Sequence, residues 1–281
     1  MIVRIGLAAG LVTLASAATG CATTAGNASG KVQVRPAAHA NDADGPQFFP
    51  PPIQLAVAED AIVRLVGPKT TCSGTLVAED LVLTAHHCVV DVKDGHFTSS
   101  LIAPTDMRVE LGGDYLPWGT IDVKEIVAPP CGEAGGAGDV AILVLTRKII
   151  GIIPYTVRVE ATPRVGETLD PAGFGRCALS PDGIRRASRE GGEVASLEPM
   201  TMHMTASVCP GDSGGPMISR GSHEVVGVVS LSAMDGDART KSPSIMARID
   251  AFRAVFANAR LIADGASKAE LPPLTCGTAA R

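Results

Sequence analysis

The fold of this chain is decided by the stretch Cys209-Pro210-Gly211-Asp212-Ser213-Gly214-Gly215-Pro216, in which a serine stands next to glycine and directly follows an acid. Glycine adopts backbone angles that other residues avoid, and it allows another segment to approach the backbone closely. Such a loop can turn the amides of Gly211 and Ser213 toward one point in front of the Ser213 hydroxyl. Two convergent amides are the donors that stabilise a developing oxyanion. The alternative for this octapeptide alone is a turn between two strands.

A serine nucleophile requires a base, and the base requires an acid that orients it. Upstream lies Thr84-Ala85-His86-His87-Cys88, and between this segment and the serine lies Gly138-Asp139-Val140-Ala141-Ile142-Leu143. The chain order His, Asp, Ser is the order of chymotrypsin-type enzymes. With all three segments present, the chain resembles the trypsin/chymotrypsin family of serine proteases over roughly residues 60–250.

This resemblance implies a catalytic triad of His87, Asp139 and Ser213, with an oxyanion hole formed by the amides of Gly211 and Ser213. Imidazole suits the base, since its unperturbed pKa of about 6.5 lies near working pH. Asp139 heads an apolar run, so we expect it to be partly buried and to need His87 as a partner. The alternative for Asp139 is an exposed turn residue. His86 stands where the family has a small residue, and we expect a surface or packing histidine.

The resemblance also implies which residues form the substrate pocket. Ser207, six positions before the nucleophile, corresponds to the pocket base, and Ser230 to the serine that supports the triad carboxylate. Ser232 and Ser244 replace glycines of the pocket walls. A family aspartate at the base attracts Arg or Lys, so the neutral Ser207 argues against trypsin-like cleavage. The side chains of Ser232 and Ser244 narrow the expected pocket, which favours Ala, Val or Leu over Phe and Arg as the substrate residue that it binds.

Many short apolar runs separated by turn residues predict an all-β chain. In the first half these runs cover Ile62–Val66, Cys72–Val77, Leu81–Thr84, Arg108–Leu111, Thr120–Val127 and Val140–Leu145. In the second half we predict strands at Gly173–Cys177, Glu224–Leu231 and Ser244–Ile249, and an exposed, easily nicked loop over residues 178–203. The resemblance implies two packed antiparallel six-stranded β-barrels with the active site in the cleft between them. Apolar spacings of three and four over residues 249–263 predict a C-terminal amphipathic helix.

The N-terminus carries an export signal. Arg4 precedes an apolar run, Ile5–Ala18, that is too short to span a bilayer comfortably. Small residues running into Cys21 resemble a bacterial lipoprotein signal, which predicts lipidation of Cys21 and a cell-envelope lipoprotein. The alternative is an ordinary signal cut after Ala15-Ser16-Ala17, which gives a soluble periplasmic or extracellular protein. Both place the chain where disulfides persist.

The predicted organisation is therefore a signal peptide, a flexible tether, a protease domain and a loose tail. Their bounds are 1–20, 21–52, 53–263 and 264–281, with the first barrel at about 53–160, the second at about 161–248 and the helix at 249–263. A net charge of −5 argues against a nucleic-acid partner. The resemblance implies protein or peptide substrates, no metal or organic cofactor, and a monomer that meets a membrane only through lipid on Cys21.

Seven cysteines leave one unpaired, and Cys21 fills that role. By resemblance, Cys72 pairs with Cys88, and the other four cysteines allow three pairings. The family partner of Cys209 follows the Ser230 strand, but residues 217–275 contain no cysteine. We therefore predict the pairs Cys177–Cys209 and Cys131–Cys276.

One departure from the family concerns activation. Animal members form a new Ile-Val-Gly-Gly-like N-terminus whose amine pairs with the acid before the nucleophile, and no such tetrapeptide precedes Ala61. Asp212 therefore needs another cation, such as an arginine of residues 176–189, or backbone amides. Two functions follow: an exported serine endopeptidase, or a catalytically silent pseudoprotease that binds or scaffolds on the same fold.

Overall fold

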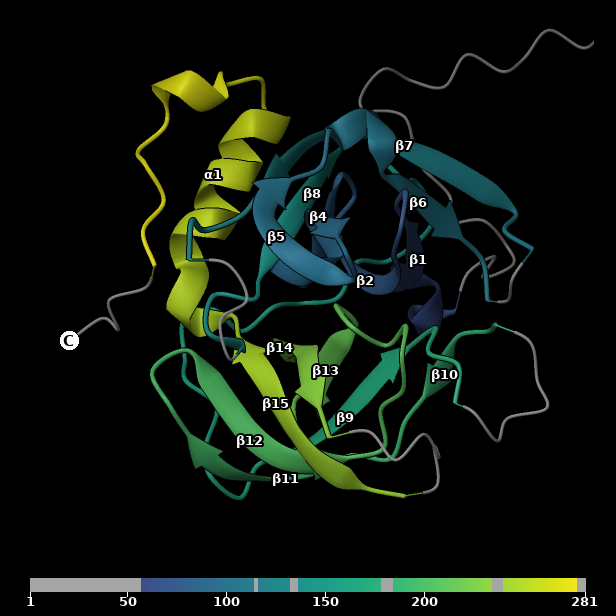
Figure 1. The fold of residues 1–281 in the computed structure, drawn as a ribbon, viewed down its shortest axis with the longest axis vertical. Coiled ribbons are helices and arrows are strands. Elements are labelled where there is room, and N and C mark those ends of the chain that lie inside the picture. The colour runs from purple at the N-terminus through teal and green to yellow at the C-terminus, as the bar shows by residue number, and fades with distance from the viewer. Residues whose placement is uncertain (1–56, 114–115, 132–135, 178–183, 234–239, 277–281) are drawn as a thin grey trace, which may run out of the picture. The chain divides into compact units, whose positions relative to one another are not determined.

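The computed structural model describes residues 57–113, 116–131, 136–177, 184–233 and 240–276 (Figure 1). The predicted signal peptide, tether and lipidation site at Cys21 lie outside these residues. Among the described residues, no helix combines the length and the apolar character needed to cross a bilayer.

Six antiparallel strands close into the first barrel in the order β1-β2-β3-β8-β7-β6 (Figure 1). Their bounds are β1 Ile62–Val66, β2 Thr71–Ala78, β3 Leu81–Thr84, β6 Arg108–Leu111, β7 Gly119–Val127 and β8 Ala141–Leu145. In β7 the exposed Thr120 and Asp122 alternate with the buried Ile121 and Val123, the period of two that places every second side chain inside. Aliphatic side chains fill the interior.

The second barrel consists of six further strands, closed by a pairing of β9 with β13. Their bounds are β9 Thr168–Gly173, β11 Gly192–Leu197, β12 Thr201–Ala206, β13 Pro216–Ser219, β14 Val225–Ser232 and β15 Ser242–Arg248. A two-residue strand, β10 (Ala187–Ser188), adds to the edge of β9. The predicted pair of antiparallel six-stranded barrels is confirmed.

The predicted C-terminal helix forms as a 3-10 turn, η5 (Asp250–Phe252), followed by α1 (Arg253–Ala263). Its buried side chains Val255 and Ile262 belong to an apolar cluster that also contains strand residues of both barrels. Arg260 adds two hydrogen bonds to Asp80, at 2.6 and 3.0 Å. The helix therefore packs on β3, β7 and β8 of the first barrel, at an apolar cluster that both barrels share.

Two local predictions were wrong. Residues 187–203 contain β10, β11 and the start of β12 instead of a solvated loop, and their charges are used inside the fold, as Arg189 shows below. Residues 174–177 do not continue the β9 strand. The amides of Phe174 and Gly175 instead donate to side chains near the nucleophile, so they are lost to the sheet ladder.

A β-hairpin that the sequence patterns did not predict follows the histidine segment. Strands β4 (Val90–Lys93) and β5 (His96–Leu101) pair only with each other in the described sheets. Asp94 and Gly95 connect them with φ angles of 51° and 79°. Positive φ at both residues of a two-residue loop is the geometry that matches the twist of hairpin strands. The hairpin carries Phe97, whose ring centroid lies 5.1 Å from that of His87.

Candidate active site

The three predicted triad residues come from three different parts of the fold. His87 lies in a 3-10 turn, η2 (His86–Val89), directly after β3, and Asp139 directly precedes the segment that becomes β8. Because β3 and β8 pair side by side, with Thr84 opposite Ala141, the two residues meet at one end of the first barrel. Ser213 lies on the loop before β13 and lines the same cleft as His87.

Asp139 binds both the ring and the backbone of His87. Its Oδ2 lies 2.8 Å from His87 Nδ1, and its Oδ1 accepts the His87 backbone amide at 2.9 Å. Ser230 Oγ donates to the same Oδ2 at 2.5 Å. The Asp139 side chain is fully buried and that of His87 is 7% exposed. This arrangement fixes the orientation of the ring and leaves Nε2 as the nitrogen not bonded to Asp139.

The electrostatics favour an ionised Asp139. Burial raises the pKa of this carboxyl, whereas the adjacent His87 and the hydrogen bonds from His87 and Ser230 lower it more, so the pKa lies below its ordinary value. A carboxylate kept charged beside an imidazole stabilises the imidazolium that forms when the base takes a proton.

His86 faces a different environment, since it is buried and lies outside the lining of the cleft. It is a packing histidine, one of the two alternatives for this position, and not a surface one.

The nucleophile loop requires glycine at two positions. Gly211 has a φ of 101° and Gly214 a φ of 79°, conformations that side chains disfavour. A Cβ on Gly214 would lie 2.1 Å from Thr84 Oγ1, so only glycine lets the loop approach the histidine segment this closely.

The loop also leaves the two predicted oxyanion donors available. The amide of Asp212 donates to the carbonyl of Cys209 at 2.9 Å, whereas the amides of Gly211 and Ser213 have no acceptor among the described residues. Ser73 fixes the intervening backbone, because its Oγ donates to the Gly211 carbonyl at 2.7 Å. Two uncommitted amides beside the serine are what an oxyanion hole requires.

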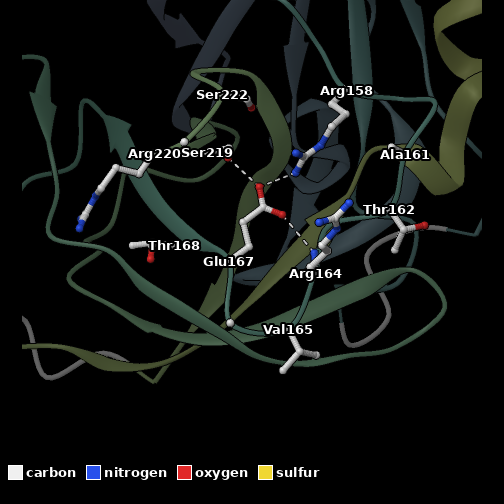
Figure 2. Close-up of a pocket in the computed structure, with 12 residues that line it drawn as sticks. Arg158, Ala161, Thr162, Arg164, Val165, Glu167, Thr168, Ser219, Arg220 and Ser222 are labelled. Atoms are coloured by element: carbon white, nitrogen blue, oxygen red, sulfur yellow. Dashed lines mark hydrogen bonds and ion pairs between the residues drawn. The ribbon is translucent and has the colours of Figure 1, made fainter.

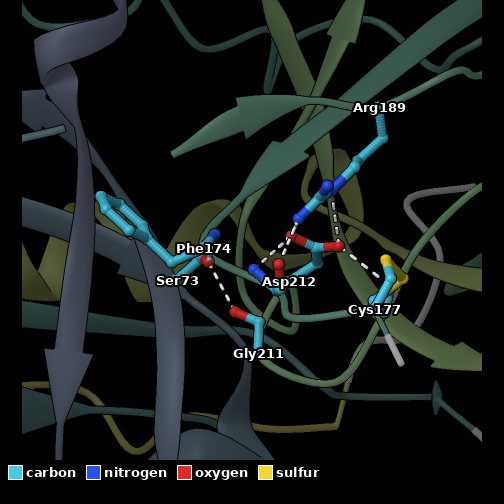
Figure 3. Close-up of polar contacts among 8 residues, drawn as sticks. Ser73, Phe174, Cys177, Arg189, Gly211 and Asp212 are labelled. Carbon is cyan, nitrogen blue, oxygen red and sulfur yellow. Dashed lines mark hydrogen bonds and ion pairs between the residues drawn. A yellow bond between two sulfur atoms is a disulfide. The ribbon is translucent and has the colours of Figure 1, made fainter. Parts of the chain in front are cut away.

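Asp212 has both of the partners that the sequence left open (Figure 3). Arg189 donates to it through Nε at 2.9 Å and through Nη2 at 3.1 Å. The backbone amides of Gly175 and Cys209 donate at 2.7 and 2.9 Å. Burial is the largest influence and raises the pKa of this carboxyl, while Arg189 and the amides oppose the rise. The loop of Ser213 is thus held by an internal arginine.

The cleft in front of the triad encloses about 330 Å³ and is lined from both barrels. Thr70, Thr71 and Cys72 line it from the first barrel, and residues of the loop before Ser213 and of β14 line it from the second. Phe97 of the hairpin lines it beside His87 and is 45% exposed. The cleft can therefore hold an extended peptide across the serine.

The predicted pocket residues lie at different depths. Ser230 and Ser232 line the cleft, but Ser207 and Ser244 do not. Ser207 is fully buried, and its hydroxyl oxygen has no hydrogen-bond partner in the described part of the chain. Val208 and Val229 line the cleft instead. The predicted base of the pocket, Ser207, is buried and lies outside the lining of this cleft.

A cluster of hydroxyls closes one side of the pocket. Ser232 Oγ lies 2.9 Å from Ser242 Oγ and 3.0 Å from Ser244 Oγ, which links β14 to β15. Ser244 therefore narrows the slot through Ser232, although its own side chain is buried behind it.

Two of the predicted disulfides are present, Cys72–Cys88 and Cys177–Cys209. The predicted Cys131–Cys276 bond is not formed, and both residues are free thiols. Burial and a hydrogen bond with Cys276 raise the pKa of Cys131 to about 12. The donor atoms of Cys72, Cys88 and His87 lie within 4.8 Å of one another. The disulfide occupies both sulfurs and leaves only the imidazole, so these residues do not fit a metal ion.

A larger cleft of about 760 Å³ lies on the second barrel and shares no lining residue with the first (Figure 2). At its centre Glu167 accepts hydrogen bonds from Ser219 Oγ and Arg158 Nη2, both at 2.6 Å, and from the amide of Arg164 at 3.1 Å. Glu167 thus joins the loop before β9 to β13, which is a structural role.

Comparisons with known proteins agree with this geometry. A trypsin-like protease of Streptomyces glaucescens is 28% identical over 244 residues, which cover 74% of this chain and 86% of that protein. The solved structure of a Glu endopeptidase in complex with MPD superposes with a TM-score of 0.58 at 21% identity, covering 74% of this chain and 93% of that one. An inactivated protease paralogue of the scabies mite, S-D1, gives a TM-score of 0.57 at 16% identity, covering 76% and 95%.

The two structural likenesses show the fold alone. The family model described as Trypsin matches residues 57–256, which is most of the chain and includes the histidine, aspartate and serine segments. This chain therefore belongs to the trypsin family of serine proteases.

Proposed function

We propose that this chain is an exported serine endopeptidase that hydrolyses peptide bonds through an acyl-enzyme intermediate. The observation that carries the proposal is the continuous arrangement of Ser230, Asp139 and His87 in the cleft that Ser213 lines. Ser213 attacks the substrate carbonyl, and His87 takes the hydroxyl proton and later gives it to the leaving amine. The amides of Gly211 and Ser213 bind the oxyanion.

The alternative is a pseudoprotease, because the scabies mite paralogue shows that this fold also occurs in an inactivated protein. Labelling with a serine-directed phosphonate decides between the two functions, since the covalent bond forms only with an activated hydroxyl. We expect the wild-type chain to gain one phosphonate at Ser213, and the Ser213→Ala variant to gain none. Ser222→Ala, which removes an exposed hydroxyl outside the cleft, should label like the wild type. An unlabelled wild-type chain would support the pseudoprotease.

We propose that the pocket prefers small or medium apolar residues before the scissile bond. Val208 and Val229 line the cleft, and the hydroxyl cluster of Ser232, Ser242 and Ser244 narrows it. Among the described residues, no acidic side chain lines the cleft, so an Arg or Lys side chain would meet no counter-ion from them.

Peptides that end in Ala, Val or Leu should therefore give a higher kcat/KM than those ending in Phe or Arg, by about 1–3 kcal/mol of discrimination. Ser232→Gly removes the hydroxyl that links Ser242 and Ser244, so this variant should gain relative kcat/KM on the Phe peptide. The measurement is steady-state kinetics on a matched series of chromogenic peptides. An Arg peptide cleaved fastest by the wild type would rule the proposed pocket out.

We further propose that Cys21 is lipidated and anchors the mature protein to a membrane. The support is the short apolar signal ending in small residues before Cys21. Acyl chains contribute about 0.8 kcal/mol per buried CH₂ group, so two or three chains hold a protein stably. Cys21→Ser should shift the protein from the detergent phase to the aqueous phase, whereas Cys276→Ser should not. Intact mass spectrometry of the mature wild type is the direct check, and a mass without acyl chains would exclude the anchor.

A further inference from the structure

An ion pair joins the start of the domain to the segment that supplies Arg189. Arg186 Nη2 donates to Asp60 Oδ1 at 2.8 Å, and the two side chains are only 13% and 16% exposed. Asp60 lies in a 3-10 turn, η1 (Ala58–Ala61), and its other carboxylate oxygen accepts the amide of Val57 at 3.0 Å. The Asp60 carboxylate therefore binds both Val57, the first described residue, and Arg186 of the segment that leads to Arg189.

The segment between Arg186 and Arg189 is short and extended. Its two central residues form β10, where Ala187 pairs with Gly173 of β9. An odd separation along a strand places two side chains on opposite faces, so Arg186 and Arg189 point in opposite directions. Arg186 reaches Asp60, while Arg189 reaches Asp212 in the nucleophile loop.

Other bonds also hold this segment, including those from Arg186 Nη1 to the carbonyl of Gly112 and from Arg189 Nη2 to the carbonyl of Gly175. The Arg186 amide donates to the carbonyl of Gly113 at 2.8 Å, and the Arg189 amide donates to the carbonyl of Pro171 at 2.8 Å. A two-residue strand on a sheet edge gives little rigidity alone, since isolated strand pairs are marginal. A mostly buried ion pair at one end therefore contributes strongly to the position of the other end.

We propose that Asp60 and Arg186 are positioning residues for the oxyanion hole. Their ion pair holds the strand that brings Arg189 to Asp212, and Arg189 in turn holds the loop with the amides of Gly211 and Ser213. The catalytic relevance of this positioning rests on the proposed function. The start of the domain thus controls the nucleophile loop through a side-chain carboxylate.

The test compares Asp60→Asn with a matched control. Arg64 and Glu110 form an ion pair between β1 and β6 of the first barrel, with side-chain exposures of 13% and 17%. Glu110→Gln therefore removes an equally buried pair elsewhere. Hydrogen–deuterium exchange is measured at the amides of Gly175 and Cys209, which donate to Asp212, together with kcat and KM.

We expect Asp60→Asn to speed exchange at both amides and to lower kcat by about 3- to 30-fold with little change in KM, the range for substitutions acting through a packed network. Asp60→Glu, which keeps the charge, should restore most of the amide protection and most of kcat. Glu110→Gln should lower Tm comparably without either effect. If the two neutral variants behave alike, the inference is wrong. A wild-type protein that no phosphonate labels would reject the proposed function. Faster amide exchange in Asp60→Asn would, even then, support the positioning role of Asp60.

Discussion

Replacing Ser213, His87 or Asp139 by alanine should each lower kcat on a peptide substrate by about 10⁴-fold or more, because the three residues act as one unit. Without Ser213 there is no acyl-enzyme, and without His87 the hydroxyl keeps its proton. The double variant His87→Ala/Ser213→Ala should be no slower than the slower single variant. Steady-state kinetics on one peptide measures all four proteins.

Asp139→Asn tests the orienting role more finely. Both carboxylate oxygens of Asp139 accept hydrogen bonds from His87, one from the ring and one from the backbone amide. An amide group must place its NH₂ against one of these donors, so the ring loses its orientation or its tautomer. We expect a loss of about 10⁴-fold in kcat, as for the wrong tautomer in this mechanism.

The control for these variants is His86→Ala, which removes the neighbouring imidazole outside the cleft. Because His86 is buried, this variant is assayed well below its Tm. It should hydrolyse the peptide at close to the wild-type rate. A loss of hydrolysis in His86→Ala together with an active His87→Ala would mean that the base is His86.

Arg189→Ala should lower both activity and stability strongly, although Arg189 touches no substrate. Asp212 is fully buried and the Arg189 side chain is 10% exposed, so the variant leaves a buried carboxylate without its cation. Breaking one side of a buried ion pair costs about 3–5 kcal/mol. We expect thermal unfolding to show a Tm well below that of the wild type, and the nucleophile loop to lose its phosphonate reactivity. The conservative Arg189→Lys variant keeps the positive charge but loses the two-nitrogen contact with Asp212. Its Tm and phosphonate reactivity should lie between those of the wild type and those of Arg189→Ala.

The pH dependence of Arg189→Ala has a defined sign. Burial already raises the pKa of Asp212 above its ordinary value of 3.8, and losing Arg189 raises it further. The folded variant then binds a proton that the unfolded chain releases, so its stability is retained below pH 3.8 and falls as pH rises toward the folded pKa. The difference in Tm between Arg189→Ala and the wild type should therefore be smaller at pH 4 than at pH 7.5, because Asp212 of the variant ionises inside the fold at the higher pH.

Adding Asp212→Asn to Arg189→Ala removes the unpaired charge. The double variant should be more stable at neutral pH than Arg189→Ala alone, which a double-mutant cycle measures as coupling. An equal Tm deficit at both pH values, with no coupling, would show that Arg189 is not the counter-ion of Asp212.

The contact between His87 and Asp139, beside the cleft that Ser213 lines, was predictable because the three residues lie in short characteristic segments. Asp139, His87 and Ser213 each stand beside residues that only this chemistry demands, such as the glycines around the serine. The barrels were predictable for a related reason, since alternating or continuous apolar residues in a short run indicate a buried strand. These local patterns carry both the fold class and the reacting groups.

The remaining features depend on contacts between distant residues. Arg189 is one of several arginines in its segment, and only the folded chain shows which one lies beside Asp212. The β4–β5 hairpin is mostly exposed, so its residues lack an apolar period. The unformed Cys131–Cys276 bond was a prediction by elimination. The burial of Ser207 depends on the packing of the folded chain, which no spacing reveals.

Asp212 receives its cation from Arg189 of the same chain. This contact forms within the folded chain and does not use an amine released by a cut. The disulfide Cys177–Cys209 lies on that same loop, and the Cys209 amide is one of the donors to Asp212. Such a bond does not persist in a reducing cytoplasm. A newly made chain would therefore gain this link to the loop of Ser213 only under oxidising conditions.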